Sequence, residues 1–476
     1  MASSGPTPRG DLAANEKVDL ADSAGMPQDP DEVPHDYDLQ QKQLRQKMDI
    51  RILPILFILL ILNYLDRNAL ALARVQGIEA DLGMAGRNFN TAISVLFVGY
   101  IIGQVPSNLA LTRARPSLYI PGFAVLWGAV SATTAAANSF GHLVAIRFFL
   151  GVCEAPFFPG ILFFLSSWYT KQELALRVSV LYTGAHLSGA FAGLIAAGIQ
   201  SGMDGLHGLE SWRWLFIIEG CITVFAGFLA IIILPDYPKT DNEKRIASLR
   251  LQRDVGVYDE ETLSVWGSVK EGAGDYKLWL MGLIYAAMTT AGGYTSFVPT
   301  VVKTFGMSNV KTLLLTAPPY LVPAFSELIV SFSSDRRPER CFHYTTPMLL
   351  GITGFIVAAT THSTAPRYFS IFLMTGGMSS SFTVLLAWVG STFARPRTKR
   401  AFAFGTVNTL GNLAQIWSPY LYPSSDGPQY VKAFSVNAAC TALAICLSLI
   451  LRMCLKRENA KLAASEVADG RKRTRP

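Results

Sequence analysis

Twelve apolar stretches, each long enough to cross a lipid bilayer, dominate this chain of 476 residues. A membrane-spanning helix needs about 20 mainly apolar residues. The stretches lie at residues 52–73, 89–111, 117–138, 142–168, 177–201, 213–234, 278–301, 312–333, 343–361, 368–390, 401–422 and 432–455. Charged residues make up 16% of the chain, well below the roughly 25% found in soluble domains. The sequence therefore predicts an all-α membrane protein with twelve transmembrane helices and disfavours a soluble enzyme.

The largest gap between these stretches, residues 235–277, is hydrophilic and follows the sixth stretch. Six spans, a linker and six further spans are typical of transporters built from two fused halves. We expect six-helix halves at residues 51–234 and 278–455, joined by a cytoplasmic linker at 235–277. Residues 1–50 are expected to form a disordered tail with a short basic helix at 40–51, and residues 456–476 a second tail.

Basic residues are distributed unevenly between alternate loops. With a cytoplasmic N-terminus, the cytoplasmic loops hold 18 Lys and Arg residues and the outer loops hold 5. Cytoplasmic loops of membrane proteins carry such an excess, so we expect both termini in the cytoplasm. The net charge of +7 then reflects topology, and no nucleic-acid partner is expected. The six cysteines show no paired spacing and no phosphate-binding Gly-Lys loop is present, so we expect no metal and no other cofactor.

Several ionisable residues fall inside the predicted spans, where each costs at least about 2.5–3.5 kcal/mol. Arg67 in the first span and Arg147 in the fourth are predicted to lie at the same depth, because the two helices run in opposite directions. Two guanidinium groups at one level suit the binding of a carboxylate. Glu154 follows Arg147 by seven residues and shares its helix face, so it is a candidate proton-coupling group. The alternative is a structural ion pair between Arg147 and Glu154.

Other polar residues in the spans are weaker candidates. Asp66 is expected to point away from Arg67, and Glu219 to pair structurally, whereas Glu327 fits proton coupling and structure equally well. A polar stripe on the eleventh span either lines a pathway or bonds between helices. The candidates for substrate binding, besides the two arginines, are Asn63, Tyr64, His186, Tyr285, Asn408 and Asn412.

Nine motifs in order along the chain carry a family resemblance. They are NYLDRNALALAR (63–74), PSNLALTRARPSLYIP (106–121), RFFLGVCEAPFFPG (147–160), SWYTKQELALR (167–177), WRWLFIIEG (212–220), LPDYPKT (234–240), LLTAPPY (314–320), SSDRR (333–337) and GNLAQIWSPYLYPSSDGPQY (411–430). With these motifs the chain resembles the major facilitator superfamily (MFS) and, within it, the fungal allantoate permease family of anion:cation symporters.

The resemblance implies a rocker-switch carrier with a central cavity between its two halves. Members of the wider group bind the substrate anion through arginines that match Arg67 and Arg147, and couple protons through the match of Glu154. We add Glu327 as a second candidate for proton coupling. His186 departs from the family pattern, which usually has a small or hydroxyl residue at that position.

The resemblance also implies a gate at the cytoplasmic ends of the helices. The superfamily's gate signature is matched by Asp335 and Arg336 with Arg340 in the second half. In the first half the corresponding loop keeps basic residues, of which Arg113 is the candidate.

We therefore expect a proton-coupled symporter of a small organic anion, a carboxylate nutrient or vitamin-like metabolite. Alternatives are an exporter of a metabolite or drug and a nutrient sensor that binds without transporting. We expect no catalytic residues, a monomer, and a multi-pass location in the lipid bilayer of the fungal plasma membrane.

Overall fold

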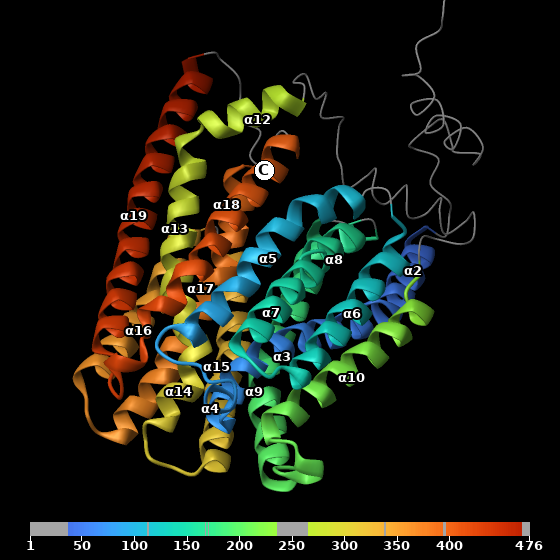
Figure 1. Ribbon diagram of the computed structural model, residues 1–476. Coiled ribbons are helices and arrows are strands. Elements are labelled where there is room, and N and C mark those ends of the chain that lie inside the picture. The colour runs from blue at the N-terminus through green and yellow to red at the C-terminus, as the bar shows by residue number, and fades with distance from the viewer. Residues whose placement is uncertain are drawn as a thin grey trace, which may run out of the picture.

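A computed structural model describes residues 37–111, 114–166, 168–169, 171–235, 265–337, 339–393 and 397–468 of the chain. Every regular element in these ranges is a helix. Figure 1 shows two groups of long helices side by side, one from the first half of the chain and one from the second. The predicted all-α membrane protein with twelve transmembrane helices in two six-helix halves is confirmed.

The first half of the chain crosses the bundle six times. Its passes are α3 (Leu53–Gln76), α5 (Asn88–Leu111), α6 (Pro116–Thr133), α7 with α8 (Phe140–Glu154 and Phe157–Ser166), α9 (Lys171–Gly202) and α10 (Ser211–Ile233). The fourth pass is divided at Pro156, because proline lacks the amide hydrogen that a continuous helix needs.

The second half also crosses six times. Its passes are α13 (Tyr276–Gly292) with η3 (Gly293–Phe297) and α14 (Val298–Lys303), α15 (Asn309–Arg336), α16 (Arg340–Thr360), α17 (Thr364–Thr392), α18 (Arg397–Trp417) with η4 (Ser418–Leu421), and α19 (Val431–Ala468). Within the described ranges, nine helices are long and apolar enough to span a membrane by composition alone. The passes that begin with α5, α13 and α18 complete the twelve.

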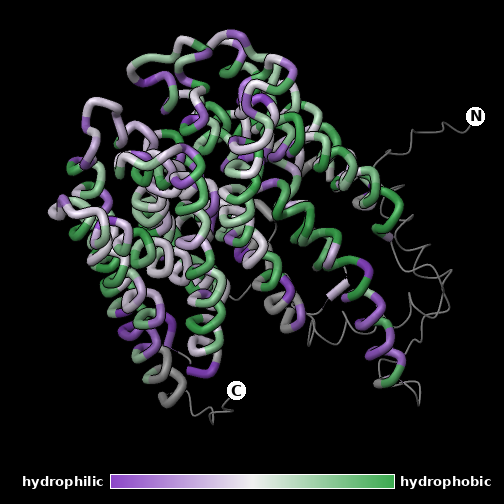
Figure 2. The backbone as a smooth tube through the Cα atoms, turned by 90° about the horizontal axis from the view of Figure 1, so that it is seen from below, coloured by the Kyte–Doolittle hydropathy of each residue, from purple (hydrophilic) through white to green (hydrophobic). Residues whose placement is uncertain are grey.

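Short helices mark the two ends of the bundle. The helices α2 (Tyr37–Arg51) and α12 (Val265–Gly274) lie at the end that also holds the last turns of α19, which we call the termini side (Figure 1). The opposite end, the far side, carries α4 (Ile78–Asp81), η2 (Leu206–Gly208) and η5 (Ser424–Asp426), and η1 (Thr134–Ala136) extends α6. Figure 2 shows long hydrophobic stretches along the helices, with hydrophilic residues gathered near helix ends.

At the chain ends, two helix bounds expected from the sequence can be compared with the structure. The short basic helix expected at residues 40–51 is present as the last part of α2. The last helix continues to Ala468, well past residue 455, where the final span was expected to end. Residues 1–36 and most of the expected linker, 236–264, lie outside the described ranges.

Glycines allow the helices of each half to pack closely. A Cβ atom at Gly151 of α7 would fall on the carbonyl oxygen of Leu96 in α5, and one at Gly377 of α17 would fall on that of Pro347 in α16. Small residues at such crossings let backbones approach each other, which is how helices associate in a bilayer. Within each half, the backbones of these neighbouring helices are thus in close contact.

The halves meet firmly at the far side. Asn90 of α5 donates from Nδ2 to the carbonyl oxygens of Pro419 and Tyr422, at 2.5 and 3.2 Å. The rings of Phe89 and Phe297 pack edge to face next to them, with centroids 6.0 Å apart. These contacts join the first half to the second and close the bundle at this end.

Ion pairs at the termini side stay within each half. Arg177 of α9 binds Asp49 of α2 at 2.6 Å, and Lys399 of α18 lies 3.3 Å from Asp275, which caps α13. Among the described residues, no ion pair joins the two halves at this end. The structure is therefore closed at the far side and less tightly joined at the termini side.

Replacing Gly151 by valine should destabilise the first half, because the side chain cannot fit between α7 and α5. Overpacking of this kind costs about 1–3 kcal/mol or more. The matched control is Gly198→Val on α9, where an added Cβ meets nothing within 4 Å. Thermal unfolding in detergent should show a lower midpoint for Gly151→Val alone. Equal midpoints for both variants would contradict the close packing.

Candidate binding cavity

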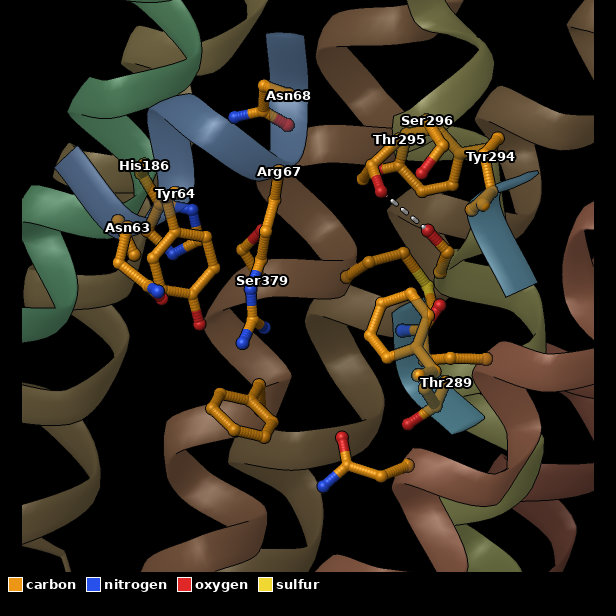
Figure 3. Close-up of a pocket in the computed structure, with 18 of the residues that line it drawn as sticks. Asn63, Tyr64, Arg67, Asn68, His186, Thr289, Tyr294, Thr295, Ser296 and Ser379 are labelled. Atoms are coloured by element: carbon orange, nitrogen blue, oxygen red, sulfur yellow. Dashed lines mark hydrogen bonds between the residues drawn. The ribbon is translucent and has the colours of Figure 1, made fainter. Parts of the chain in front are cut away.

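A cavity of about 320 Å³ lies between the two halves. Helices α3, α5, α7, α8 and α9 line it from the first half, and α13, η3, α15, α17 and α18 from the second. All eight residues predicted to bind substrate are in this lining: Asn63, Tyr64, Arg67, Arg147, His186, Tyr285, Asn408 and Asn412. Figure 3 shows Asn63, Tyr64 and His186 on one wall and Thr289, Tyr294 and Ser296 on the other.

Helix α3 turns one polar face to the cavity and another into the first half. Asn63, Tyr64, Arg67 and Asn68 line the cavity, at spacings that share one side of a helix. Asp66 points away, as expected, and accepts a hydrogen bond of 2.7 Å from Ser131 of α6 while being fully buried. Of these two adjacent residues, Asp66 therefore packs inside the first half and Arg67 lines the cavity.

The arginine on α3 is held by the glutamate at the end of α7. Arg67 donates from Nε to Oε2 of Glu154 at 2.6 Å, and the Glu154 side chain is completely buried. Its guanidinium carbon lies 5.0 Å from the ring centre of Tyr100 and 5.5 Å from that of Tyr64, within the range of a cation–π contact. The alternative ion pair between Arg147 and Glu154 is wrong, because the partner of Glu154 comes from a neighbouring helix.

The second arginine has no anionic partner among the described residues. Arg147 is 2% exposed and lines the cavity, and its Nε and Nη1 atoms have no hydrogen-bond acceptor. A buried guanidinium with free N–H groups is costly unless an anion reaches it. Arg147 therefore lies at the cavity with two guanidinium nitrogen atoms that are buried and unpaired.

A second acid–base contact crosses between the halves. Nε2 of His186 on α9 lies 2.8 Å from Oε2 of Glu327 on α15. The carboxyl side chain is 2% exposed, whereas the imidazole is 21% exposed and lines the cavity. The sequence proposed separate roles for these residues and did not predict that they meet.

The wall from the second half is neutral. Asn408 and Asn412 line the cavity together with Gln415, so the polar stripe on α18 faces the pathway. Tyr285 and Thr289 of α13 complete this wall with hydroxyl groups. The cavity thus has a cationic wall from the first half and a hydrogen-bonding wall from the second.

Aromatic side chains narrow the cavity toward the termini side. The ring of Tyr182 on α9 lies 5.3 Å from that of Phe158 and 5.3 Å from that of Phe382 on α17. Phe382 also contacts Tyr285, with centroids 5.6 Å apart. Of these contacts, the one between Tyr182 and Phe382 connects the halves, and because it is not an ion pair it can separate with little electrostatic cost.

The predicted gate residues are only partly described. Arg113 and the side chain of Asp335 lie outside the described part of the chain. Arg336 is exposed, with its guanidinium carbon 4.1 Å from the ring centre of Phe332, and Arg340 donates to Ser334 Oγ at 2.8 Å. Both are at the termini side of the second half.

One expectation about a buried acid fails. Glu219 of α10 is 1% exposed, but neither of its carboxyl oxygens has a hydrogen-bond partner in the described structure. It was expected to pair structurally. Sequence reasoning also missed Tyr100, Tyr182 and Phe382, because aromatic residues in an apolar span look the same in the core and in a cavity.

The comparisons with known proteins agree with this architecture. A family model described as Major Facilitator Superfamily matches residues 56–419. The chain is 34% identical to the MFS-type transporter cnsO of Penicillium expansum, over 90% of this chain and 86% of that protein. It is 31% identical to the major facilitator-type transporter hxnP of Emericella nidulans, over 96% of this chain and 97% of that one.

Solved structures share the fold at low sequence identity. A bacterial homologue of the human lysosomal transporter Spinster, in an inward-facing and occupied conformation, superposes with a TM-score of 0.66 at 15% identity. The xylose transporter XylE from E. coli, in a partially occluded inward-open conformation, also gives 0.66, at 13% identity. Each match covers 84% of this chain and 96% of the other.

Closure at the far side can be tested with a cysteine in the cavity. In a background without the native cysteines, Ser296→Cys should react with a membrane-impermeant reagent from the termini side and be protected from the far side. Adding Asn90→Ala removes the hydrogen bonds to Pro419 and Tyr422, so labelling from the far side should increase several-fold. Ser94→Ala is the control, because Ser94 bonds only within α5, to Asn90. Equal labelling in both variants would show that Asn90 does not hold the halves together.

Proposed function

The chain belongs to the major facilitator superfamily, and on that premise we propose that it is a proton-coupled symporter of a small organic anion. The observation that carries this proposal is that Arg67 and Arg147 line one cavity, while Glu154 is buried behind Arg67 and contacts it at 2.6 Å. One arginine is neutralised by a buried carboxylate, and the other has unpartnered N–H groups. An anionic substrate would therefore add the ion-pair partner that Arg147 lacks among the described residues.

The same arrangement supplies a mechanism for coupling. While Glu154 is ionised, it holds Arg67 through the 2.6 Å contact. Protonation of Glu154 removes this counter-charge, so Arg67 is free to join Arg147 in binding a carboxylate. Anion and proton therefore favour each other's binding. The proton releases Arg67 from Glu154, and the anion then takes the place of Glu154 beside Arg67. Loss of the proton restores the Arg67–Glu154 pair and expels the anion.

The size and polarity of the cavity support a small carboxylate. A volume of about 320 Å³ is at the lower end of the range for small-molecule sites. The anionic end of the substrate would lie between the arginines, where a planar guanidinium can donate two parallel hydrogen bonds. Its uncharged body would face the neutral wall, where Asn408, Asn412 and Tyr285 offer amide and hydroxyl groups. The resemblance to allantoate permeases supports the same class of substrate.

The closed far side and the bias of basic residues support an orientation. We assign the termini side to the cytoplasm, with a location in the plasma membrane, so that the structure is inward-facing. The substrate would enter from outside when the contacts around Asn90 open, and leave as the aromatic contacts of Tyr182 and Phe382 separate. The predicted gate residues Asp335, Arg336, Arg340 and Arg113 would hold the cytoplasmic ends of the halves together in the outward-facing state.

Uptake into proteoliposomes tests the proposal. The probes are radiolabelled benzoate and nicotinate, each compared with its neutral amide, with protein-free liposomes subtracted. A gradient with acid outside should drive accumulation of at least one carboxylate above equilibrium and of neither amide. The proposal fails if amides accumulate equally, if the opposite gradient drives accumulation, or if carboxylates bind without accumulating.

Replacing Glu154 by glutamine should separate exchange from net uptake. The amide mimics the protonated carboxyl, so Arg67 remains available and carboxylate exchange should persist. Net uptake driven by the pH gradient should fall by tenfold or more, because the group that releases the proton is gone. The measurement compares counterflow with gradient-driven uptake of the same carboxylate. Unchanged gradient-driven uptake would remove Glu154 from the coupling mechanism.

Replacing Arg147 by lysine should weaken substrate binding while preserving the charge. Lysine cannot form the paired hydrogen bonds of a guanidinium, and a charge-assisted hydrogen bond contributes about 1.5–3 kcal/mol. The dissociation constant for the carboxylate should rise by about 10- to 100-fold. Binding would be measured on protein whose elution from a sizing column matches the wild type. Wild-type affinity in this variant would assign Arg147 a purely structural role.

A further inference from the structure

The contact between His186 and Glu327 is the acid–base pair that links the two halves of the described structure within the membrane. His186 belongs to α9 of the first half and Glu327 to α15 of the second, and their side chains approach to 2.8 Å. Neither oxygen of Glu327 accepts a hydrogen bond of good geometry, although both are buried. A buried carboxyl in this condition has a strong preference for a proton or for a cation beside it.

The nearby ionisable groups neither exchange protons near neutral pH nor add much net charge to His186 and Glu327. Tyr64 of α3 and Tyr182 of α9 lie within electrostatic reach of Glu327, and phenols do not ionise near neutral pH. Arg67 lies beyond Tyr64, and its own counter-charge is Glu154. It therefore contributes little net charge to the pair.

The other described helices that pack against α9 and α15 place no charged side chain beside His186 and Glu327. Ser326, next to Glu327, bonds to the carbonyl oxygen of Gly376 on α17. The ionisable groups of the remaining packed helices lie at their ends or face other partners: Arg367 on α17, Lys303 on α14, Arg340 and His343 on α16, and Arg213 on α10. Glu219, in the middle of α10, is buried without a hydrogen-bond partner, and the charged group within its electrostatic reach is Asp66 of α3.

We propose that His186 and Glu327 form one proton-binding site across the two halves, distinct from the site at Glu154. The pair shares a single proton, either as imidazolium with carboxylate or as imidazole with carboxylic acid. A second proton gives imidazolium beside a neutral carboxyl, which breaks the ion pair and raises the net charge of the site by one. Imidazole is the side chain that takes up protons nearest to physiological pH.

The location of the pair gives this charge step a role. The imidazole is partly exposed to the cavity, on the same wall as Arg67 (Figure 3). A second proton therefore adds positive charge to the cationic wall and strengthens the attraction for an anion. This consequence rests on the proposed function, whereas proton binding by the pair does not. It also assigns His186 a role in proton binding in place of the direct substrate contact expected from the sequence.

Infrared titration of the protein in liposomes, without substrate, tests the site directly. The readout is the absorption of protonated carboxyl groups as the pH is lowered. One band should be missing in Glu327→Gln, which identifies it as Glu327. In His186→Gln this band should appear about one pH unit or more higher than in the wild type, because the carboxylate has lost its cationic partner. The control is His343→Gln, since His343 contacts Ser333 and the Glu339 carbonyl at the start of α16.

The possible outcomes separate the proposal from its rivals. A Glu327 band that titrates identically in the wild type and in His186→Gln would overturn the shared site. An equal shift in His343→Gln would also overturn it, because the effect would then not belong to the pair. If Glu327→Gln is poorly folded, Glu327→Asp keeps the carboxyl and should move the band without removing it.

A second measurement tests the effect on anions. The apparent affinity for a transported carboxylate should rise on acidification in the wild type, and this rise should be reduced several-fold in His186→Gln. An unchanged rise would overturn the assigned role in anion attraction. Failure of the proposed function would appear as absent carboxylate transport with the infrared shift still present, so the two failures are distinguishable.

Discussion

Two guanidinium groups that line a cavity between membrane-spanning helices are the constraint on which this structure depends. An arginine at this depth needs a counter-charge, an aromatic face or a polar cavity. Arg67 has the first two, in Glu154 and the rings of Tyr64 and Tyr100. Arg147 has only the cavity, since its Nε and Nη1 atoms have no partner. The cavity between the halves is therefore lined by one arginine that has a carboxylate partner and one that has none at ion-pair distance among the described residues.

The two halves contribute unequally to this cavity. The first half supplies the arginines and the histidine, whereas the second supplies amides, hydroxyls and aromatic rings. Charge selection and shape selection are thus separated on opposite walls. Under the proposed function, the anion would stay bound to Arg67 and Arg147 on the charged wall while its contacts with the neutral wall are exchanged. Only His186 and Glu327 place an acid–base contact between the walls in the described structure.

The sequence predicted the parts of the structure that depend on periodicity and depth. Hydrophobic length predicted the twelve passes, and helix geometry predicted that Asn408, Asn412 and Gln415 share one face. The sequence could not identify the partner of Glu154. A spacing of seven residues shows that two side chains share a face of one helix, but it does not show how the neighbouring helix is rotated. The contact of His186 with Glu327 was invisible for the same reason, as it joins residues 141 positions apart. Tyr182 and Phe382 gave no signal, because rings in an apolar span have the same pattern whether they pack or line a pathway.

At the two ends of the cavity the halves meet through different kinds of contact, and this difference has a mechanical consequence. At the far side, Asn90 bonds to backbone carbonyls of Pro419 and Tyr422, so closure depends on exact geometry. At the termini side, the rings of Tyr182, Phe382 and Tyr285 meet through apolar surfaces that tolerate sliding. Hydrogen bonds lose most of their energy with a small displacement, whereas ring contacts lose it gradually. The far side should therefore open as a single step, while the termini side should open progressively.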